Sequence, residues 1–261
     1  DKNMPARFLL PLIDQKAASG FVNASLALDQ ARAVKDIQEQ ELMRKASHLN
    51  DMAMAEITHF FKEGVTETDL AEQLKKIYRD LGADGLSFEP LFAFGSNAAS
   101  GHHWPDDTRL KPGDCILVDI GCTWEGYCSD MTRTFFYKNV TQHQQEVYHT
   151  VLKANEEAEK AVTPGISLSS LDQIARGIIT DKGYGSAFTH RLGHFIGLED
   201  HEFGDVSSAS ADRAVPGNIF SIEPGVYLEN DMGVRVEDLV LVTDHGHEIL
   251  NHFSKELTVI D

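Results

Sequence analysis

Positively charged residues are scarce in this sequence, and long apolar runs are absent. The 261 residues include 23 Lys and Arg against 41 Asp and Glu, which gives a formal net charge of −18. A chain this acidic is a poor candidate for binding nucleic acid or anionic membranes, because both carry negative charge themselves. No apolar run approaches the roughly 18 residues of a membrane span, and the first residues do not resemble a signal peptide. These absences predict a cytoplasmic protein with neither nucleic acid nor membrane among its partners.

Cysteine is also rare. Cys115, Cys122 and Cys128 lie close together without forming a C-x-x-C pair. This pattern is typical of reduced thiols, so a disulfide framework is not expected. The hydrophobic content of 42% is enough for a large core, in one domain or two.

Two acidic residues interrupt the apolar pattern near the middle of the chain. Asp119 follows the apolar run 116–118, and Asp130 precedes the strand-like run 132–137. The glycine-containing segment between them suits a hairpin. Both carboxylates would then lie near the apolar ends of neighbouring strands, where they repel each other and lose solvation, so each needs a partner. Taken alone, the pair is equally consistent with a turn Asp and a strand-end Asp.

The chain repeats this arrangement. Residues 112–121 and 216–225 both read Pro-Gly, five mostly apolar residues, an acid, one further residue and Gly. A second acid precedes a strand-like run after each copy. Two related halves could therefore bring two pairs of carboxylates together. The four acids are Asp119, Asp130, Glu223 and Glu237.

Helical periodicity precedes each copy of the acidic repeat. In the first half it covers residues 36–62 and 70–81, the latter after a capping box at 66–69. In the second half it covers 147–161 and 171–178, with Ser167 as the expected cap.

Strand-like stretches follow the helix pairs, at residues 87–94 in the first half and around Phe188 in the second. Paired helices and hairpin-connected strands predict an α+β fold with two pseudo-symmetric halves. The sheet is expected to be mostly antiparallel, with helices on one face and carboxylates on the other. Residues 1–34 lack strong periodicity and are interpreted as a leading segment or linker, which leaves 35–261 as one domain.

Four carboxylates cannot share a pocket unless cations neutralise them. Bridging carboxylates suit two divalent metals, about 3.5–4 Å apart. Oxygen-rich ligation with one imidazole fits Mn, Co, Fe or Zn better than a metal that selects thiolates. His194 is the natural imidazole, because its glycine neighbours allow close approach, although a single His is more often a surface or core residue. His201 is equally unremarkable by itself.

Five motifs contain the acids and histidines described above. They are Val118-Asp119-Ile120-Gly121, Asp130-Met131-Thr132-Arg133-Thr134, Gly193-His194-Phe195-Ile196-Gly197-Leu198 with His201-Glu202, Ser221-Ile222-Glu223-Pro224-Gly225, and Gly233-Val234-Arg235-Val236-Glu237-Asp238. Together they resemble the pita-bread metallopeptidases, and most closely their Xaa-Pro dipeptidase and Xaa-Pro aminopeptidase branch. Methionine aminopeptidases share that fold but usually have Glu-His in the last motif, where this chain has Arg235-Val236-Glu237-Asp238, which favours the proline-directed branch. The resemblance begins near residue 36.

The resemblance implies a ligand set for two divalent metal ions, with Mn expected and Co, Fe or Zn as alternatives. Asp119 would chelate one metal, while His194 and Glu223 would bind the other. Asp130 and Glu237 would each bridge both metals.

The resemblance also implies residues that contact substrate. His102 would support the leaving group and is favoured over the adjoining His103. His201 would steady the tetrahedral intermediate. Arg235 would lie near the metals and substrate, although a structural ion pair with one of the acids is an equal alternative.

The implied activity is hydrolysis of an Xaa-Pro bond, in dipeptides or at the N-terminus of peptides. A metal-bound hydroxide would attack the scissile carbonyl, because two metals lower the pKa of a shared water from about 15.7 towards 7. Glu223 would orient that nucleophile and move its proton. Small peptides are the expected substrates.

Relatives of this branch carry a further N-terminal domain that helps in dimerisation. We therefore expect this chain to be the catalytic domain of a longer protein, homodimeric when full length. The alternatives are a catalytically inactive pita-bread domain that binds proteins, a metal-free hydrolase such as a creatinase, and an enzyme that acts on other bonds such as phosphotriesters.

Overall fold

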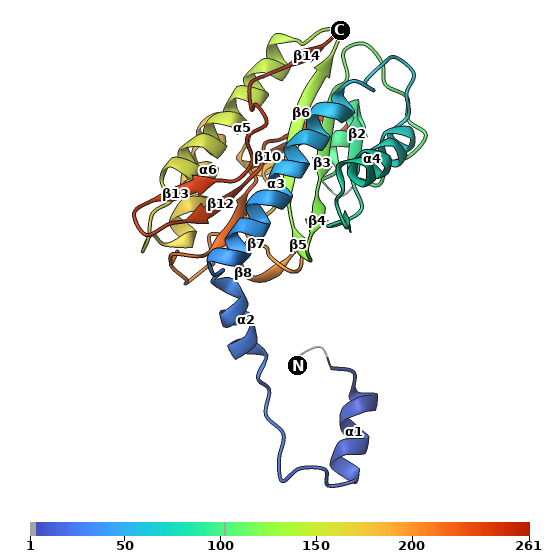
Figure 1. Ribbon diagram of the computed structural model, residues 1–261. Helices are drawn as coiled ribbons and strands as arrows, with labels where there is room; N and C mark the ends of the chain where they lie inside the picture. Colours follow the sequence, from blue (N-terminus) through green and yellow to red (C-terminus); the bar gives the residue numbers. More distant parts are fainter. Residues whose placement is uncertain (1–3, 102) are drawn as a thin grey trace.

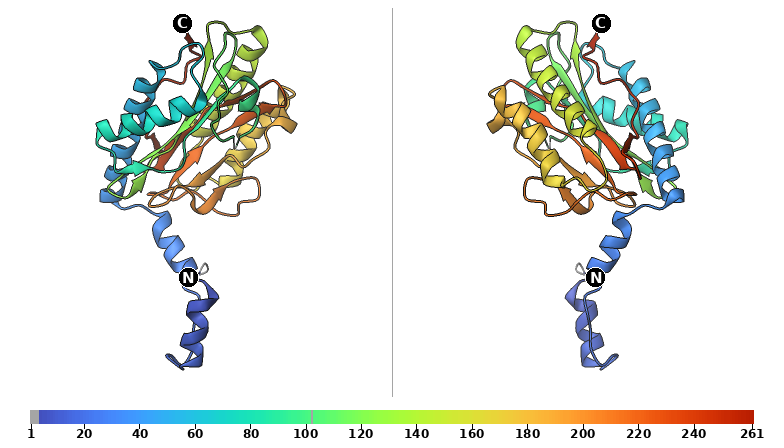
Figure 2. Two further views of the ribbon diagram at one scale, coloured as in Figure 1. Left: turned by 90° about the vertical axis from the view of Figure 1, so that its right-hand side faces the viewer. Right: turned by 90° about the vertical axis from the view of Figure 1, so that its left-hand side faces the viewer.

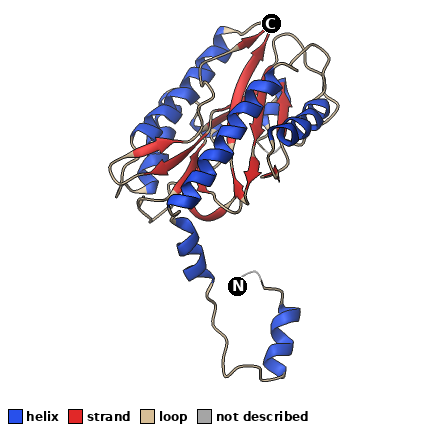
Figure 3. Ribbon diagram, in the orientation of Figure 1, coloured by secondary structure: helices blue, strands red, loops and turns tan. Residues whose placement is uncertain are grey.

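The structure, a computed structural model, describes residues 4–101 and 103–261 (Figure 1). Helices and strands alternate in groups along the chain (Figure 3). The helices are α1 (Ala6–Asp14), α2 (Ser25–Ala33), α3 (Ile37–Thr58), α4 (Glu67–Leu81), α5 (Gln142–Lys160) and α6 (Leu168–Asp181), with short 3-10 helices η1 (Gly95–Ala99) and η2 (Gly185–Ala187). The strands are β1 (Gly85–Leu86), β2 (Leu91–Phe94), β3 (Cys115–Ile120), β4 (Cys122–Trp124), β5 (Tyr127–Cys128), β6 (Met131–Tyr137), β7 (Gly193–Phe195), β8 (Glu202–Val206), β9 (Ile219–Ile222), β10 (Gly225–Leu228), β11 (Met232–Arg235), β12 (Asp238–Val242), β13 (His247–Ile249) and β14 (Val259–Ile260).

Two sheets form the centre of the molecule: one consists of strands from the first half of the sequence with the C-terminal strand β14 added at its edge, and the other consists of strands from the second half. The first has the order β14-β6-β3-β2 and the second the order β13-β12-β9-β7-β8. Within both sheets the neighbouring strands run antiparallel, apart from the parallel pair of β14 and β6. This architecture is the α+β pita-bread fold, as the sequence predicted.

Side chains along β3 alternate between the face that packs on α3 and α4 and the face that carries Asp119. Ile116, Val118 and Ile120 pack with the apolar residues of α3 and α4, whereas Leu117 belongs to the cluster formed with α5 and α6. Successive side chains of a strand point to opposite faces, so Asp119 lies on the face away from α3 and α4. The carboxylate of this strand therefore lies on the face opposite α3 and α4, as expected, but Leu117 on that same face packs in the cluster of α5 and α6.

Equivalent backbone contacts recur in the two halves. The N–H of Gly64 donates to the carbonyl of Leu110 at 2.9 Å, and the N–H of Gly165 donates to the carbonyl of Ala214 at 2.8 Å. Each bond joins the turn before a second helix to the segment that leads into an acid-bearing strand. The sequence repeat therefore reflects a structural repeat.

A buried asparagine from a helix reaches the end of the acid-bearing strand in both halves. The Asn50 amide, on α3, donates to the carbonyl of Ile120 at 2.8 Å, and the Asn155 amide, on α5, donates to the carbonyl of Ile222 at 2.9 Å. Both asparagines are fully buried. Each bond satisfies a carbonyl beside an acid and fixes its helix against the sheet.

The helix starts agree with the sequence in one half and differ in detail in the other. The Thr66 hydroxyl accepts from the N–H of Asp69 at 3.0 Å, and the Asp69 carboxylate accepts from the N–H of Thr66 at 3.2 Å, which confirms the capping box. Ser167 precedes α6, but its hydroxyl lies 2.7 Å from that of Ser169 and makes no cap bond to the helix. Ser167 therefore occupies the N-cap position of α6, as expected, but its hydroxyl is engaged by a neighbouring hydroxyl and not by a backbone N–H of the helix.

Two further elements differ from expectation. The segment interpreted as a leading segment or linker contains α1 and α2, which project away from the body in all three views (Figures 1 and 2). No residue of α1 is buried. Phe188 follows η2 rather than lying in a strand, and its ring packs 4.2 Å from the Arg176 guanidinium. No helix in the described part of the chain combines the length and apolarity needed to span a membrane.

Replacing Asn50 with Leu should lower the free energy of unfolding by about 1–3 kcal/mol, because the Ile120 carbonyl would be buried without a donor. The Tyr78 hydroxyl, which donates to Asn50 at 2.6 Å, would lose its acceptor as well. Urea unfolding measures the change. The exposed Gln142→Ala is the control, expected within about 0.5 kcal/mol of the parent. Equal midpoints for both variants would contradict the role assigned to Asn50.

Candidate metal centre

Four acids converge where the two sheets meet. Asp119 lies on β3 and Asp130 directly precedes β6, while Glu223 directly follows β9 and Glu237 directly precedes β12. The N–H of Glu237 donates to the carbonyl of Thr132 at 3.1 Å, and the Thr132 hydroxyl donates to the Glu237 carboxylate at 2.6 Å. These bonds join the halves beside the acids, so the strand pairing itself brings the carboxylates together.

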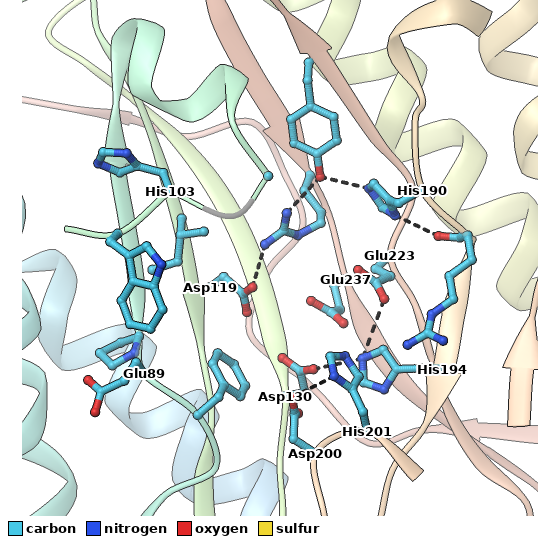
Figure 4. A pocket seen from close by; sticks show the side chains of 18 of the residues that line it. Glu89, His103, Asp119, Asp130, His190, His194, Asp200, His201, Glu223 and Glu237 are labelled. Carbon is cyan, nitrogen blue, oxygen red and sulfur yellow. Dashed lines mark hydrogen bonds and ion pairs between the residues drawn. The ribbon is translucent and has the colours of Figure 1, made fainter. Parts of the chain in front are cut away.

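His194 lies among these acids on β7 (Figure 4). Its Nε2 is 3.4 Å from Asp130 and 3.6 Å from Glu223. Its Nδ1 is 3.2 Å from the carbonyl of Phe195, an arrangement that assigns the proton to Nδ1 and leaves the Nε2 lone pair facing the carboxylates. Burial, followed by the proximity of His201, holds the pKa of His194 well below its usual value. A neutral imidazole is the form that binds a metal.

The donor set fits divalent cations. Asp130, His194 and Glu237 each offer a ligand atom, and these atoms lie within 4.8 Å of one another. One buried oxygen of Asp119, one of Asp130 and one of Glu237 have no hydrogen-bond partner. Unpaired buried carboxylate oxygens are unfavourable unless a cation occupies the space that they face. Carboxylate oxygens with one imidazole suit Mn, Fe, Co or Zn.

The buried acids also resist ionisation as a group. Burial raises the pKa of Asp130 well above its usual range, and repulsion from Glu237 adds to the effect. Burial and repulsion from Glu223 do the same for Glu237. Burial raises the pKa of Glu223 to about 7, although attraction to Arg235 offsets part of the rise. Cations in this cluster would reverse these shifts by favouring the ionised carboxylates.

Arg235 forms an ion pair with one of the acids, the structural alternative that the sequence left open. Its Nη2 donates to Asp119 at 2.5 Å, its Nη1 to the Tyr227 hydroxyl at 2.8 Å and its Nε to the Thr132 hydroxyl at 2.9 Å. Arg235 is buried, and it also lines the cavity beside the cluster. The guanidinium therefore holds Asp119 in place from the cavity side.

Of the two histidines expected near substrate, His201 lies in the described part of the chain. The His201 ring is 4.0 Å from that of His194, centroid to centroid, in an edge-on arrangement. His102 lies outside the described residues. The neighbouring His103 lines the cavity, and its Nε2 is 2.6 Å from the buried Glu67 carboxylate.

A cavity of about 670 Å³ opens beside the acids. Its wall includes residues that the sequence analysis did not select, among them Phe88, Trp104, His190, Asp200 and Tyr227. The spacing of His190 four residues before His194 was a signal that could have identified it. The Tyr227 hydroxyl, 2.9 Å from His190, links it to Arg235. The aromatic wall residues come from separate segments, two loops and strand β10, and no local pattern distinguishes them from core residues.

The repeated α+β halves and the buried donor set define a pita-bread protein with a candidate metal centre. The sequence profile of metallopeptidase family M24 matches residues 41–244. The chain belongs to this family. An uncharacterised peptidase of Staphylococcus aureus strain MW2 is 41% identical over 244 residues, which cover 94% of this chain and 70% of the relative.

Solved structures of the family superpose closely on this chain. The prolidase of Pyrococcus horikoshii OT3 gives a TM-score of 0.96 at 32% identity, over 98% of this chain and 74% of that one. The X-Pro aminopeptidase of Thermotoga maritima MSB8 gives 0.95 at 32% identity, over 99% and 74%. A dipeptidase of Mycobacterium ulcerans gives 0.93 at 35% identity, over 99% and 69%.

Metal should change how stability depends on pH. The folded pKa of Glu223 is about 7, above the unfolded value of about 4.3. The folded, metal-stripped protein therefore binds more protons than the unfolded chain, so its stability should fall as pH rises from about 4 to above 7. Mn²⁺ should reverse the trend, because deprotonation favours binding.

Thermal unfolding of EDTA-treated and Mn²⁺-loaded protein between pH 5 and 8 measures this effect. The difference in Tm should widen as pH rises. A difference that stays constant with pH would show that the acids do not lose protons on binding.

Proposed function

We propose that this chain is a dinuclear metal-dependent peptidase that hydrolyses an Xaa-Pro bond, in dipeptides or at the N-terminus of peptides. The observation that supports this most strongly is the meeting of four carboxylates and one imidazole beside a cavity, with buried carboxylate oxygens that lack partners. The superposition on a prolidase and an X-Pro aminopeptidase supports the choice of bond.

The residues would divide between two ions. Asp119 would hold one, His194 and Glu223 would hold the other, and Asp130 and Glu237, whose ligand atoms lie within 4.8 Å of that of His194, would be shared between them. Two divalent ions bound here would polarise the scissile carbonyl and acidify a water molecule. Manganese is the first candidate metal, with Co, Fe and Zn as alternatives.

Glu223 acts as the general base that accepts the proton of the attacking water. Its Oε1 accepts from the Ser221 hydroxyl at 3.2 Å, which fixes the carboxylate direction. Ser221 is in turn held by the N–H of His194, which donates to its oxygen at 3.0 Å. A carboxylate fixed in this way can accept a proton at a defined position and pass it to the leaving nitrogen.

His201 stabilises the charge that develops on the scissile carbonyl oxygen. Its ring is edge-on to that of His194, so both imidazoles border one region of the cavity. One preorganised hydrogen-bond donor to an oxyanion is worth about 3–4 kcal/mol. His102 would support the leaving group, a role that rests on the sequence resemblance alone.

The cavity wall suits a proline ring. Phe88, Leu91 and Trp104 supply apolar surface to the same cavity that the acids line. The nitrogen of an Xaa-Pro bond carries no hydrogen, so recognition has to rely on ring shape and apolar contact. An apolar wall provides this recognition, because the proline nitrogen has no N–H and the site needs no hydrogen-bond acceptor for it.

Metal content and peptide hydrolysis test the proposal together. The chain dialysed against Mn²⁺ should retain close to two ions and hydrolyse Ala-Pro or Ala-Pro-Pro but not Ala-Ala. Asp130→Asn should lose bound metal and at least about 100-fold in kcat/KM, because a bridging ligand is removed. Asp244→Asn, at an exposed turn, is the matched control and should behave as the parent. A protein that binds no metal and cleaves none of these peptides would support a binding module instead.

The role of His201 is separable from metal binding. His201→Ala should reduce kcat by about 10²–10³-fold, as expected for loss of one oxyanion donor, while metal content stays unchanged. Steady-state kinetics with metal analysis on the same sample measures both quantities. A variant that keeps the parental kcat would remove His201 from the mechanism.

A further inference from the structure

The loop that carries Asp200 and His201 ends in a buried carboxylate outside the metal cluster. The side chain of Glu202 is only 3% exposed, and four N–H groups surround its two oxygens. Lys35 Nζ donates to Oε2 at 2.9 Å, and Arg32 donates to Oε1 through Nε at 3.1 Å and Nη2 at 2.7 Å. The N–H of Leu198, within the same loop, donates to Oε1 at 2.9 Å. Glu202 therefore closes the loop on itself and ties it to residues about 170 positions earlier.

Arg32 lies in the last turn of α2, and Lys35 follows in the short segment between α2 and α3. This part of the chain is anchored separately. The N–H of Lys35 donates to the carbonyl of Gly217 at 2.7 Å. The Asn218 amide donates to the carbonyl of Ala33 at 2.8 Å, and Val34 forms a β-bridge with Asn218. The segment is thus held against the start of β9, the strand that leads to Glu223.

There is no spare space around this ion pair. Lys35 is 2% exposed. A Cβ at Gly197 would lie 2.8 Å from both Glu202 oxygens and from Lys35 Cε. Although burial opposes ionisation, attraction to Lys35 and Arg32 lowers the pKa of Glu202, so the carboxylate stays charged at neutral pH. The position of the loop is therefore defined by packing as well as by charge.

The opposite side of this loop faces the metal cluster. The His201 ring meets that of His194, and Asp200 lies within hydrogen-bonding reach of Asp130. A displacement of the Glu202 end would move both side chains relative to the acids. Positioning errors near 1 Å can cost about 100-fold in rate.

We propose that Lys35 and Arg32 are positioning residues of the active site, which hold His201 at the cavity through Glu202. The segment that the sequence suggested as a linker is therefore part of the framework of the site. The contacts of Lys35 and Arg32 with Glu202 are called the charged tie below. The expected effect of this tie on catalysis rests on the proposed function, but its effect on the order of the loop does not.

The choice of a charged tie supports a positioning role rather than simple stabilisation. A buried ion pair contributes little net stability compared with an apolar pair of similar size, because desolvation offsets the attraction. It does impose direction, since a carboxylate with four donors has one favourable orientation. Direction is the property that a catalytic loop requires.

Lys35→Met tests the tie, with Lys75→Met as the matched control. Lys75 also lies 2.9 Å from a glutamate, but that pair is exposed. We expect Lys35→Met to lower kcat by about 10–100-fold with KM and metal content unchanged. Hydrogen exchange should accelerate for the amides of residues 197–202 and not for those of β3 or β6. Lys75→Met should change neither quantity.

A double-mutant cycle separates positioning from general damage. In the His201→Ala background, Lys35→Met should cause no further loss of kcat, because the residue it positions is already absent. Equal loss in both backgrounds would overturn the proposal. Glu202→Gln, which keeps the shape, provides the same test if Lys35→Met does not fold.

Failure of the proposed function gives a different result. A parent protein that hydrolyses no Xaa-Pro peptide would refute that function, while the exchange comparison would still decide the tie. Faster exchange confined to residues 197–202 in Lys35→Met supports it. Unchanged exchange there overturns it.

Discussion

Repulsion among buried carboxylates is the constraint on which the rest of this structure depends. Strand pairing brings four acids to one place, and burial prevents water from separating their charges. Uncompensated buried ions cost several kcal/mol each. The surrounding groups therefore oppose that cost: Arg235 pairs with Asp119, and Thr132 donates to Glu237. One buried oxygen each of Asp119, Asp130 and Glu237 remains without a partner, so cations bound by these oxygens would also stabilise the fold.

Much of this arrangement follows from the sequence, because its determinants are local. Period-two alternation places Asp119 opposite the residues that pack on the helices, and the repeat of the Pro-Gly-strand-acid pattern identifies Glu223 as its counterpart. The capping box at Thr66 is equally local. The roles of individual acids required the resemblance to a family, since spacing along a strand does not say which oxygens share an ion.

Other features depend on contacts between distant segments and have no local signal. Asn50 looks like any helix residue until the carbonyl of Ile120 is placed beside it. Glu202 looks like a surface acid until Lys35, 167 positions earlier, reaches it. The strand expected around Phe188 was wrong because apolar character there serves packing against Arg176. In each case the deciding partner is supplied by the tertiary structure.

The bond between Thr132 and Glu237 spans 105 positions in the sequence. Contacts of such long range form late in folding, because the chain loses conformational entropy on closing a large loop before the contacts can stabilise it. Each half alone supplies only two of the four acids, so a partly folded chain presents two incomplete groups of ligands. Assembly of the complete cluster therefore requires that the two halves have docked, and a metal site that needs all four acids can form only after the scaffold.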